Sequence, residues 1–299
     1  MAELPVTLSE QSVDERGAYA RWGDGLRRLP WPPLLILGTL LVMALFAPLL
    51  AGHSPFDQSL ANRLQPPAWV DGGSADHLLG TDKLGRDLFA RIIHGTRVTL
   101  SVAVASLLAG ATAGAIVGIA AGYLGGRVDS LLMRVVDAAM AFPMILIALL
   151  LAVTMGAGYA TVVLAIALVL WARFARIIRG EVLSVRQRDF IAFARISGCS
   201  HLRIMLLHVL PNVMNTLLVL TTLNLGYTII VEASLSFLGA GIPPPIPSWG
   251  QMVAEGREHI SSAWWLSVAP GLAIALTVLA FNSLGDWLRD TLDPKLRQI

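Results

Sequence analysis

AAMAFPMILIALLLAVTMGAGYATVVLAIALVLWA, residues 138–172, is the stretch that decides the fold, because it contains no Asp, Glu, Lys, Arg or His. As one continuous helix it would be about 52 Å long, whereas a bilayer core of about 30 Å is crossed by roughly 20 helical residues. Gly156-Ala157-Gly158 interrupts the apolar pattern near its middle, and glycine pairs of this kind are typical of turns. The stretch is therefore predicted to be two membrane spans joined by a very short turn.

Four other apolar stretches complete an all-α membrane protein with six transmembrane helices. No A-x-A cleavage site follows the first stretch, so it is expected to be an uncleaved span rather than a signal peptide. The chain is 55% hydrophobic and only 14% charged, against about 25% charged residues in soluble proteins. That difference excludes a soluble globular enzyme. The four further spans are predicted at Leu34–Ala51, Val98–Tyr123, Val213–Val231 and Leu266–Gly285.

Charge placement orients these spans. Positive residues mark the cytoplasmic side, and arginines gather before the first span, between the second and third, after the fourth, and in the tail. The long loop after the first span also carries positive residues and does not fit this rule. The net charge of +2 is too small for a nucleic-acid-binding surface. The predicted division is a cytoplasmic segment 1–33, a first span 34–51, a periplasmic loop 52–97, a core 98–285 holding five spans and a cytoplasmic loop 173–212, and a cytoplasmic tail 286–299.

The two long outer loops carry weaker signals. A helix capped by Thr81 or Asp82 and stopped by Gly95 has one apolar and one polar face, which suits a helix lying in the membrane interface. The second loop contains Pro243-Pro244-Pro245, which forbids regular helix. Irregular backbone near a membrane is tolerated where it lines a passage, and a rigid external turn is the equally good alternative.

The inner loop 173–212 is too long for a simple connector. A helical pattern from Asp189, a break at Gly198, a second helical pattern over Leu202–Leu210 and a proline at the start of the fifth span indicate a helix–turn–helix outside the membrane. A short exposed helix with apolar residues needs a partner. The alternative is a basic patch that binds anionic membrane lipid.

The usual sites of chemistry are missing from the sequence. Neither Lys83 nor Lys295 follows a glycine, so there is no phosphate-binding P-loop. No H-E-x-x-H or G-x-S-x-G motif occurs, and no catalytic, cofactor-binding or metal site is predicted. The predicted span interiors hold no ionisable residue, which argues against a self-powered carrier. Asp137, Glu181 and Glu232 are expected to be interfacial.

Polar residues within the spans either line a path or form hydrogen bonds between helices. The candidates for a translocation path are Asn215, Thr222, Asn224 and Asn282. A membrane protein with no energy source of its own and a large exposed inner loop is expected to draw its energy from a partner docked on that loop.

Several motifs give the chain a resemblance to a known family. They are Leu-Gly-Thr-Asp-Lys-Leu-Gly-Arg-Asp at 79–87, Ala-Gly-Tyr-Leu-Gly-Gly at 121–126, Leu-Ser-Phe-Leu-Gly at 235–239, Phe-Asn-Ser-Leu-Gly-Asp at 281–286 and Leu-Asp-Pro-Lys at 292–295. With these motifs the chain resembles the C-type membrane permease of bacterial dipeptide/oligopeptide ABC importers. The ATPase-docking motif of that family, E-A-A-x3-G-x9-I-x-L-P, is matched at Ala194, Gly198, Leu210 and Pro211, but Ala192, Phe193 and His208 depart from it.

The resemblance implies a type I ABC importer permease fold in a bacterial inner membrane, with both termini cytoplasmic. It implies a heterodimer with a related permease, two ATP-binding subunits that carry ATP-Mg, and a periplasmic or lipid-anchored substrate-binding protein. The implied cargo is di- or oligopeptides, and the alternative cargo is nickel, glutathione or another small solute. A secondary transporter or a membrane enzyme is a more distant alternative for the class of protein. A coupling helix is expected around Ile196–Ile204. The residues assigned to ATPase coupling are Ala192, Phe193, Ala194, Arg195, Gly198, Ser200, His201, Leu202, His208, Leu210 and Pro211.

Overall fold

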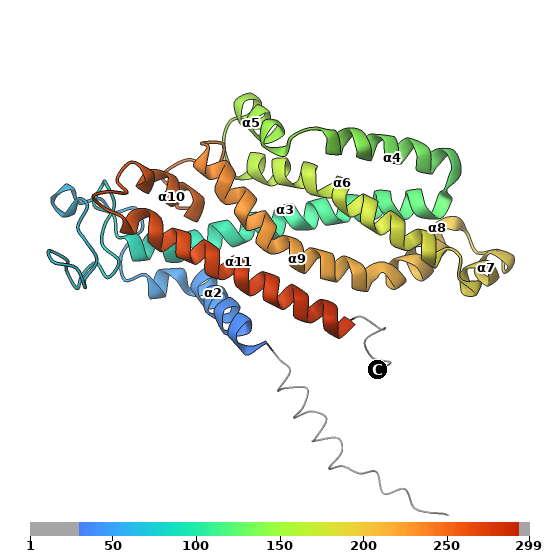
Figure 1. The fold of residues 1–299 in the computed structure, drawn as a ribbon, viewed down its shortest axis with the longest axis horizontal. Coiled ribbons are helices and arrows are strands. Elements are labelled where there is room, and N and C mark those ends of the chain that lie inside the picture. The colour runs from blue at the N-terminus through green and yellow to red at the C-terminus, as the bar shows by residue number, and fades with distance from the viewer. Residues whose placement is uncertain (1–29, 293–299) are drawn as a thin grey trace, which may run out of the picture.

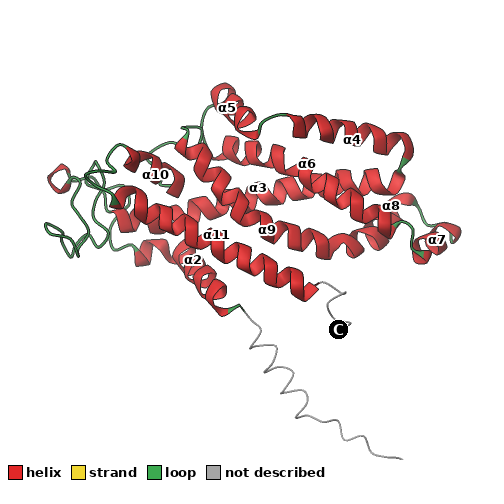
Figure 2. Cartoon of the chain, in the orientation of Figure 1, coloured by secondary structure: helices red, strands yellow, loops and turns green. Residues whose placement is uncertain are grey.

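The computed structural model describes residues 30–292, and every regular element within them is helical (Figures 1 and 2). Most of the predicted segment 1–33 and the last seven residues of the predicted tail lie outside the described residues. One isolated β-bridge, between Thr81 and Asp87, joins two points of the first long loop. The helices are α2 (Trp31–Leu50), α3 (Leu88–Leu124), α4 (Gly126–Ala141), α5 (Met144–Met155), α6 (Tyr159–Val185), α7 (Asp189–Ile196), α8 (His201–Ile204), the π-helical turn η2 (Met205–Val209), α9 (Leu210–Phe237), α10 (Trp249–Arg257), α11 (Trp265–Leu292) and the short 3₁₀ turn η1 (Leu60–Asn62).

The long helices α3, α6, α9 and α11 run roughly along the long axis of the molecule (Figure 1). Among the described residues, five helical segments are long and apolar enough to cross a membrane: α2, α3, α6, the continuous segment His201–Phe237 and α11. The pair α4 and α5 passes the same test together, although the two helices are bent by 83°. The prediction of an all-α membrane protein with six spans is confirmed with this bent pair as the sixth.

The third predicted span is broken rather than straight. We expected it to begin near Ala138, but α4 ends at Ala141 and α5 begins at Met144. Pro143 causes the break, because proline disfavours helical backbone in the residue before it, and Phe142 is extended (φ −84°, ψ 133°). The 12 residues of α5 span only about 18 Å, which is too short to cross a bilayer core alone.

The predicted interfacial helix between Thr81 and Gly95 is wrong. Asp87 caps α3 by accepting a hydrogen bond from the backbone N–H of Ala90 at 2.7 Å, and the helix then runs on without interruption to Leu124. Gly95 does not stop it. A Cβ atom at Gly95 would lie 3.1 Å from Cδ1 of Trp249, so this glycine makes room for a buried indole.

The inner loop is shorter than predicted because α6 continues to Val185. The expected coupling helix at Ile196–Ile204 is instead the last residue of α7, a turn and the whole of the short helix α8. Pro211 does not interrupt the chain, since one helical segment runs from His201 to Phe237. Proline has no N–H and its ring crowds the preceding turn. The helix accommodates it by widening at η2, where the Leu210 N–H reaches back to the Met205 carbonyl.

The centre of the fold is the contact between α3 and α6. Four glycines spaced one turn apart on α3 face α6 so closely that a Cβ on any of them would lie within 2.5–2.8 Å of an α6 atom. Small residues at this spacing let two membrane helices approach until their backbones nearly touch. The glycines are Gly110, Gly114, Gly118 and Gly122, and the α6 residues that they meet include Leu170, Phe174, Ile178 and Val182.

Gly114→Ala should destabilise the protein. The added Cβ would lie 2.5 Å from both Phe174 Cβ and the Trp171 carbonyl, and overpacking of this kind costs roughly 1–3 kcal/mol. Thermal unfolding of the purified protein should show a lower midpoint. Gly38→Ala is the matched control, because no atom lies within 4 Å of a Cβ at that position in α2. Equal midpoints for the two variants would contradict this account of the α3–α6 contact.

Candidate functional site

The residues expected to couple to an ATPase lie together at one end of the molecule, around α7 and α8 (Figure 1). The long loop after α2 and helix α10 lie at the opposite end. We call these the inner end and the outer end. Ala192, Phe193, Ala194 and Arg195 belong to α7, whereas Gly198 and Ser200 belong to the turn that follows. His201 and Leu202 begin α8, His208 lies in η2, and Leu210 and Pro211 begin α9.

One face of α7 is buried against the rest of the protein. Ile191 is fully buried and Ala194 is 8% exposed. Both belong to an apolar cluster with Tyr123 of α3, Val182 of α6 and Ile204 of α8. The position of α7 is therefore fixed by the ends of α3 and α6, the two helices that form the centre of the fold.

Tyr123 holds the helix–turn–helix segment from both sides. The Arg195 guanidinium carbon lies 5.1 Å from the centroid of the Tyr123 ring, within the range of a cation–π contact. The Tyr123 hydroxyl shares a hydrogen bond of 3.2 Å with Nδ1 of His201. Through these two contacts α3 is attached to α7 and to α8.

The turn between α7 and α8 has the conformation that its sequence requires. Gly198 has φ +77°, a left-handed conformation that glycine adopts without strain. Ser200 caps α8 by accepting a hydrogen bond from the Arg203 backbone N–H at 3.3 Å. The helix break predicted at Gly198 is present, and the glycine itself is exposed.

The other face of α7 carries a stripe of exposed apolar side chains. Phe190, Phe193 and Ile196 are spaced three residues apart and are 37%, 68% and 83% exposed, respectively. Residues at this spacing lie on one side of a helix. Leu202 of α8 is 63% exposed as well. At the position of the motif glutamate, Ala192 is exposed beside this stripe, so the surface is apolar where the motif would place a negative charge.

The predicted path residues do not form a continuous line. Asn215 and Thr222 are seven residues apart on α9 and share one side, whereas Asn224, two residues further on, points to nearly the opposite side. Thr222 and Asn224 donate hydrogen bonds to carbonyls of their own helix, at 2.9 Å and 2.8 Å. Asn282 of α11 lies against Gly226 of α9, where an added Cβ would come within 2.7 Å of its Oδ1. Their place on a path stays a prediction.

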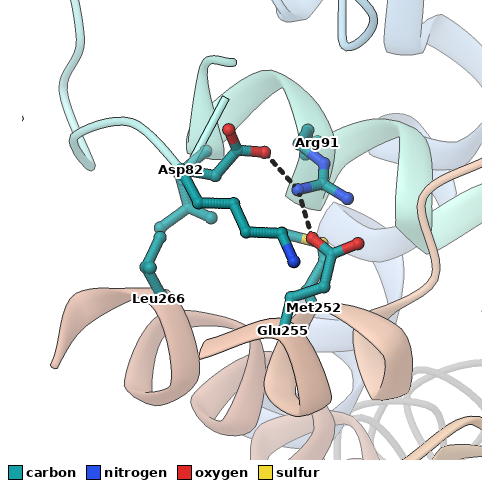
Figure 3. A pocket seen from close by; sticks show the side chains of 7 residues that line it. Asp82, Arg91, Met252, Glu255 and Leu266 are labelled. Carbon is teal, nitrogen blue, oxygen red and sulfur yellow. Dashed lines mark hydrogen bonds and ion pairs between the residues drawn. The ribbon is translucent and has the colours of Figure 1, made fainter. Parts of the chain in front are cut away.

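The outer end holds a buried ion cluster that the sequence did not predict (Figure 3). Arg91 of α3 is 1% exposed and contacts both Asp82 and Glu255 of α10, the latter at 2.9 Å. Arg86 donates from Nε to Asp82 at 2.6 Å and from its terminal nitrogen to Glu255 at 3.3 Å. The Trp265 indole N–H donates to the Thr81 carbonyl at 3.3 Å. These contacts tie the first outer loop to α3, α10 and α11.

Asp137 and Glu232, two of the three carboxylates expected to be interfacial, differ in their burial and in their partners. Asp137 is exposed and pairs with Arg176 across α4 and α6. Glu232 lies near the end of α9, but it is fully buried inside the protein and accepts a hydrogen bond from the Ser236 hydroxyl at 2.8 Å. Hydropathy could not show this burial, which depends on the loop that folds back between α9 and α10.

The bundle of spans with an exposed helix at one end defines a multi-pass membrane protein. Comparison with known proteins identifies its family. The profile of the binding-protein-dependent transport system inner membrane component matches residues 114–298, and that of the N-terminal membrane domain of oligopeptide transport permease C matches residues 34–67. The chain belongs to the family of inner-membrane components of binding-protein-dependent ABC importers, which work with ATPase and binding-protein partners.

Several curated proteins share most of the chain. A di/tripeptide transport system permease of Pseudomonas aeruginosa is 42% identical over 88% of this chain and 87% of its own. A dipeptide transport system permease of Bacillus subtilis is 42% identical over 91% and 83%. A glutathione transport system permease of Pectobacterium atrosepticum is 38% identical over 99% and 97%.

A solved structure shows the same fold. A chain of the inward-facing MetNI methionine ABC transporter superposes with a TM-score of 0.56 at 18% identity, covering 68% of this chain and 96% of that one. The predicted type I importer permease architecture is confirmed by this likeness, and the chain is a multi-pass protein of the bacterial inner membrane.

Arg91→Met should destabilise the outer end. The variant leaves Asp82 and Glu255 with Arg86 as their remaining partner in the cluster, and removing one member of a buried ion pair costs about 3–5 kcal/mol. The expected result is a lower thermal midpoint and a smaller yield of folded protein in detergent. Arg97→Met is the control, because Arg97 is exposed on the same helix. A cluster without structural importance would leave the two variants equally stable.

Proposed function

We propose that this chain forms one half of the translocation pathway of an ATP-driven importer of di- and oligopeptides. The observation that carries the proposal is the 42% identity, over 88% of the chain, to a permease described as a di/tripeptide transporter. Such similarity over nearly the full length favours a shared cargo class as well as a shared fold. A related, non-identical permease would supply the other half of the pathway.

Energy enters through the apolar stripe of α7. Phe193 and Ile196 are among the most exposed apolar side chains of the inner end, and apolar surface of this kind at the end of a membrane protein is typical of a protein interface. Two ATP-binding subunits, which carry ATP-Mg, would each receive such a helix from one permease. Because Ala192 replaces the motif glutamate, docking here depends on apolar contact more than on charge.

Motion of an ATPase subunit would reach the membrane through rigid contacts. The buried face of α7 lies on α3 and α6, and these two helices touch too closely to slide past each other. A displacement of α7 therefore moves α3 and α6 as one body, as in the rocking motions by which transporters open alternately to each side. The Gly198 turn and the π-helical turn η2 are the places where the angle of α7 and α8 to α9 can change.

The orientation follows from the same assignment. ATP-binding subunits dock at the inner end, so we place that end, the start of α2 and the end of α11 in the cytoplasm. The outer end then faces the periplasmic or lipid-anchored binding protein. Basic residues support this placement, because Arg188, Arg195 and Arg203 all lie at the inner end and are exposed, and positive residues favour the cytoplasmic side.

Phe193→Asp should prevent assembly with the ATP-binding subunits. A charge at the centre of an apolar contact is buried without a partner on docking, which costs several kcal/mol. We expect the ATP-binding subunit encoded with this chain to co-purify with the wild type and to be lost from the variant. The matched control is Phe56→Asp, a half-exposed phenylalanine of the outer loop. Retention of the ATPase by Phe193→Asp would overturn the docking assignment.

Uptake by the reconstituted transporter tests the cargo. Proteoliposomes containing this chain, its partner permease, the ATP-binding subunits and the binding protein should accumulate labelled dipeptide only when ATP is supplied. Glutathione is the second candidate, since a glutathione permease is 38% identical over 99% of this chain. Accumulation of glutathione without dipeptide would replace the proposed cargo, and accumulation without ATP would refute the mechanism.

A further inference from the structure

Three potential metal ligands meet at the outer end, outside the ion cluster of Arg91. His53, His77 and Asp87 each offer one ligand atom, and these atoms lie within 4.8 Å of one another. His77 donates from Nδ1 to Oδ2 of Asp87 at 2.8 Å. The rings of His53 and His77 lie with their centroids 5.3 Å apart. Nothing in the function proposed above requires two histidines and a carboxylate at this point.

The chain brings the three residues together from separate segments. His53 follows the end of α2, where Gly52 has φ +67° and turns the chain. His77 lies between two turn hydrogen bonds, from its own N–H to the Ser74 carbonyl at 3.1 Å and from the Gly80 N–H to its carbonyl at 2.8 Å. Asp87 uses Oδ1 to cap α3, which fixes the carboxylate and presents Oδ2 to the histidines.

The donor set selects a class of cation. Two imidazoles and one carboxylate suit Zn²⁺ and its first-row neighbours, whereas Ca²⁺ and Mg²⁺ prefer oxygen ligands. Zinc binds nitrogen and oxygen at about 2.0–2.2 Å, so two neighbouring ligands of one ion lie about 3 Å apart. His77 and Asp87 already have that spacing, at 2.8 Å. His53 is exposed, and one of its ring nitrogens lies within 4.8 Å of the ligand atoms of His77 and Asp87.

We propose that His53, His77 and Asp87 bind a divalent first-row transition metal ion, with zinc as the best fit and water in the open position. The ion would act as a clip between the end of α2 and the start of α3. Such a clip matters here because only 6% of the apolar window of α2 is buried inside the protein, the lowest share among the five continuous spans. The competing explanation is a hydrogen-bonded arrangement without metal. In it His77 connects Asp87 to Asn62, because Nε2 of His77 lies 3.5 Å from Nδ2 of Asn62.

The test measures metal binding directly and does not depend on transport. The full chain, purified with its partner subunits through a tag that contains no histidine, is stripped with EDTA, dialysed and titrated with ZnCl₂ by calorimetry. His53→Ala is the first variant, because removing an exposed side chain leaves the fold intact. His259→Ala is the matched control, since His259 lies at the same outer end but outside the cluster.

We expect one Zn²⁺ per chain, a higher thermal midpoint with Zn²⁺ than with Mg²⁺, and zinc affinity weakened by at least 10- to 100-fold in His53→Ala. The control should bind as the wild type does. Asp87→Asn is the second variant: asparagine caps a helix as well as aspartate does but is a weaker zinc ligand, so it should keep the fold and lose affinity. Absence of stoichiometric zinc binding by the wild type, or equal binding by His53→Ala and His259→Ala, would overturn the proposal.

Discussion

The close approach of α3 to α6 is the constraint on which the rest of the structure depends. In a membrane, apolar side chains gain little by leaving lipid for protein, so helices associate mainly through tight van der Waals packing. The glycine row from Gly110 to Gly122 provides that packing over about three turns of helix. Each glycine fixes the register as well as the distance, because α6 atoms lie within 2.5–2.8 Å of the position that a Cβ would take.

This helix pair also connects the two ends of the molecule. At the outer end, α3 begins beside the buried cluster in which Arg91 contacts Asp82 and Glu255. At the inner end it finishes at Tyr123, which contacts both Arg195 and His201. Two neighbouring elements are attached less firmly: only 6% of the apolar window of α2 is buried, and α4 and α5 each have a single buried residue. The stiff elements are therefore those that join the inner end to the outer end, and the looser ones lie at the edges, where rearrangement disturbs few contacts.

The features that the sequence predicts correctly are those that local composition determines. The spans followed from hydropathy, and the turn at Gly198 followed from glycine in a helical pattern. The features that the sequence did not predict depend instead on contacts between distant parts of the chain. The burial of Glu232 and Arg91 depends on partners distant in sequence, such as Glu255 of α10. The sequence predicts Gly95 to end a helix, whereas in the structure a glycine is required there because Trp249 packs against it. The helix break at Pro143 is predictable from the sequence, because proline disfavours helical backbone in the residue before it.

The docking motif has a glutamate where this chain has Ala192. The two apolar faces of α7 account for this difference. Its buried face needs Ile191 and Ala194 to rest on α3 and α6. Its free face carries Phe190, Phe193 and Ile196. A glutamate between them would add a charge that must be desolvated in the docking proposed for the free face. Alanine removes that cost, so the same geometry can be kept while the balance of forces at the interface shifts from charge pairing to apolar contact. An ATPase partner adapted to this chain should accordingly present an apolar rather than a basic surface to position 192.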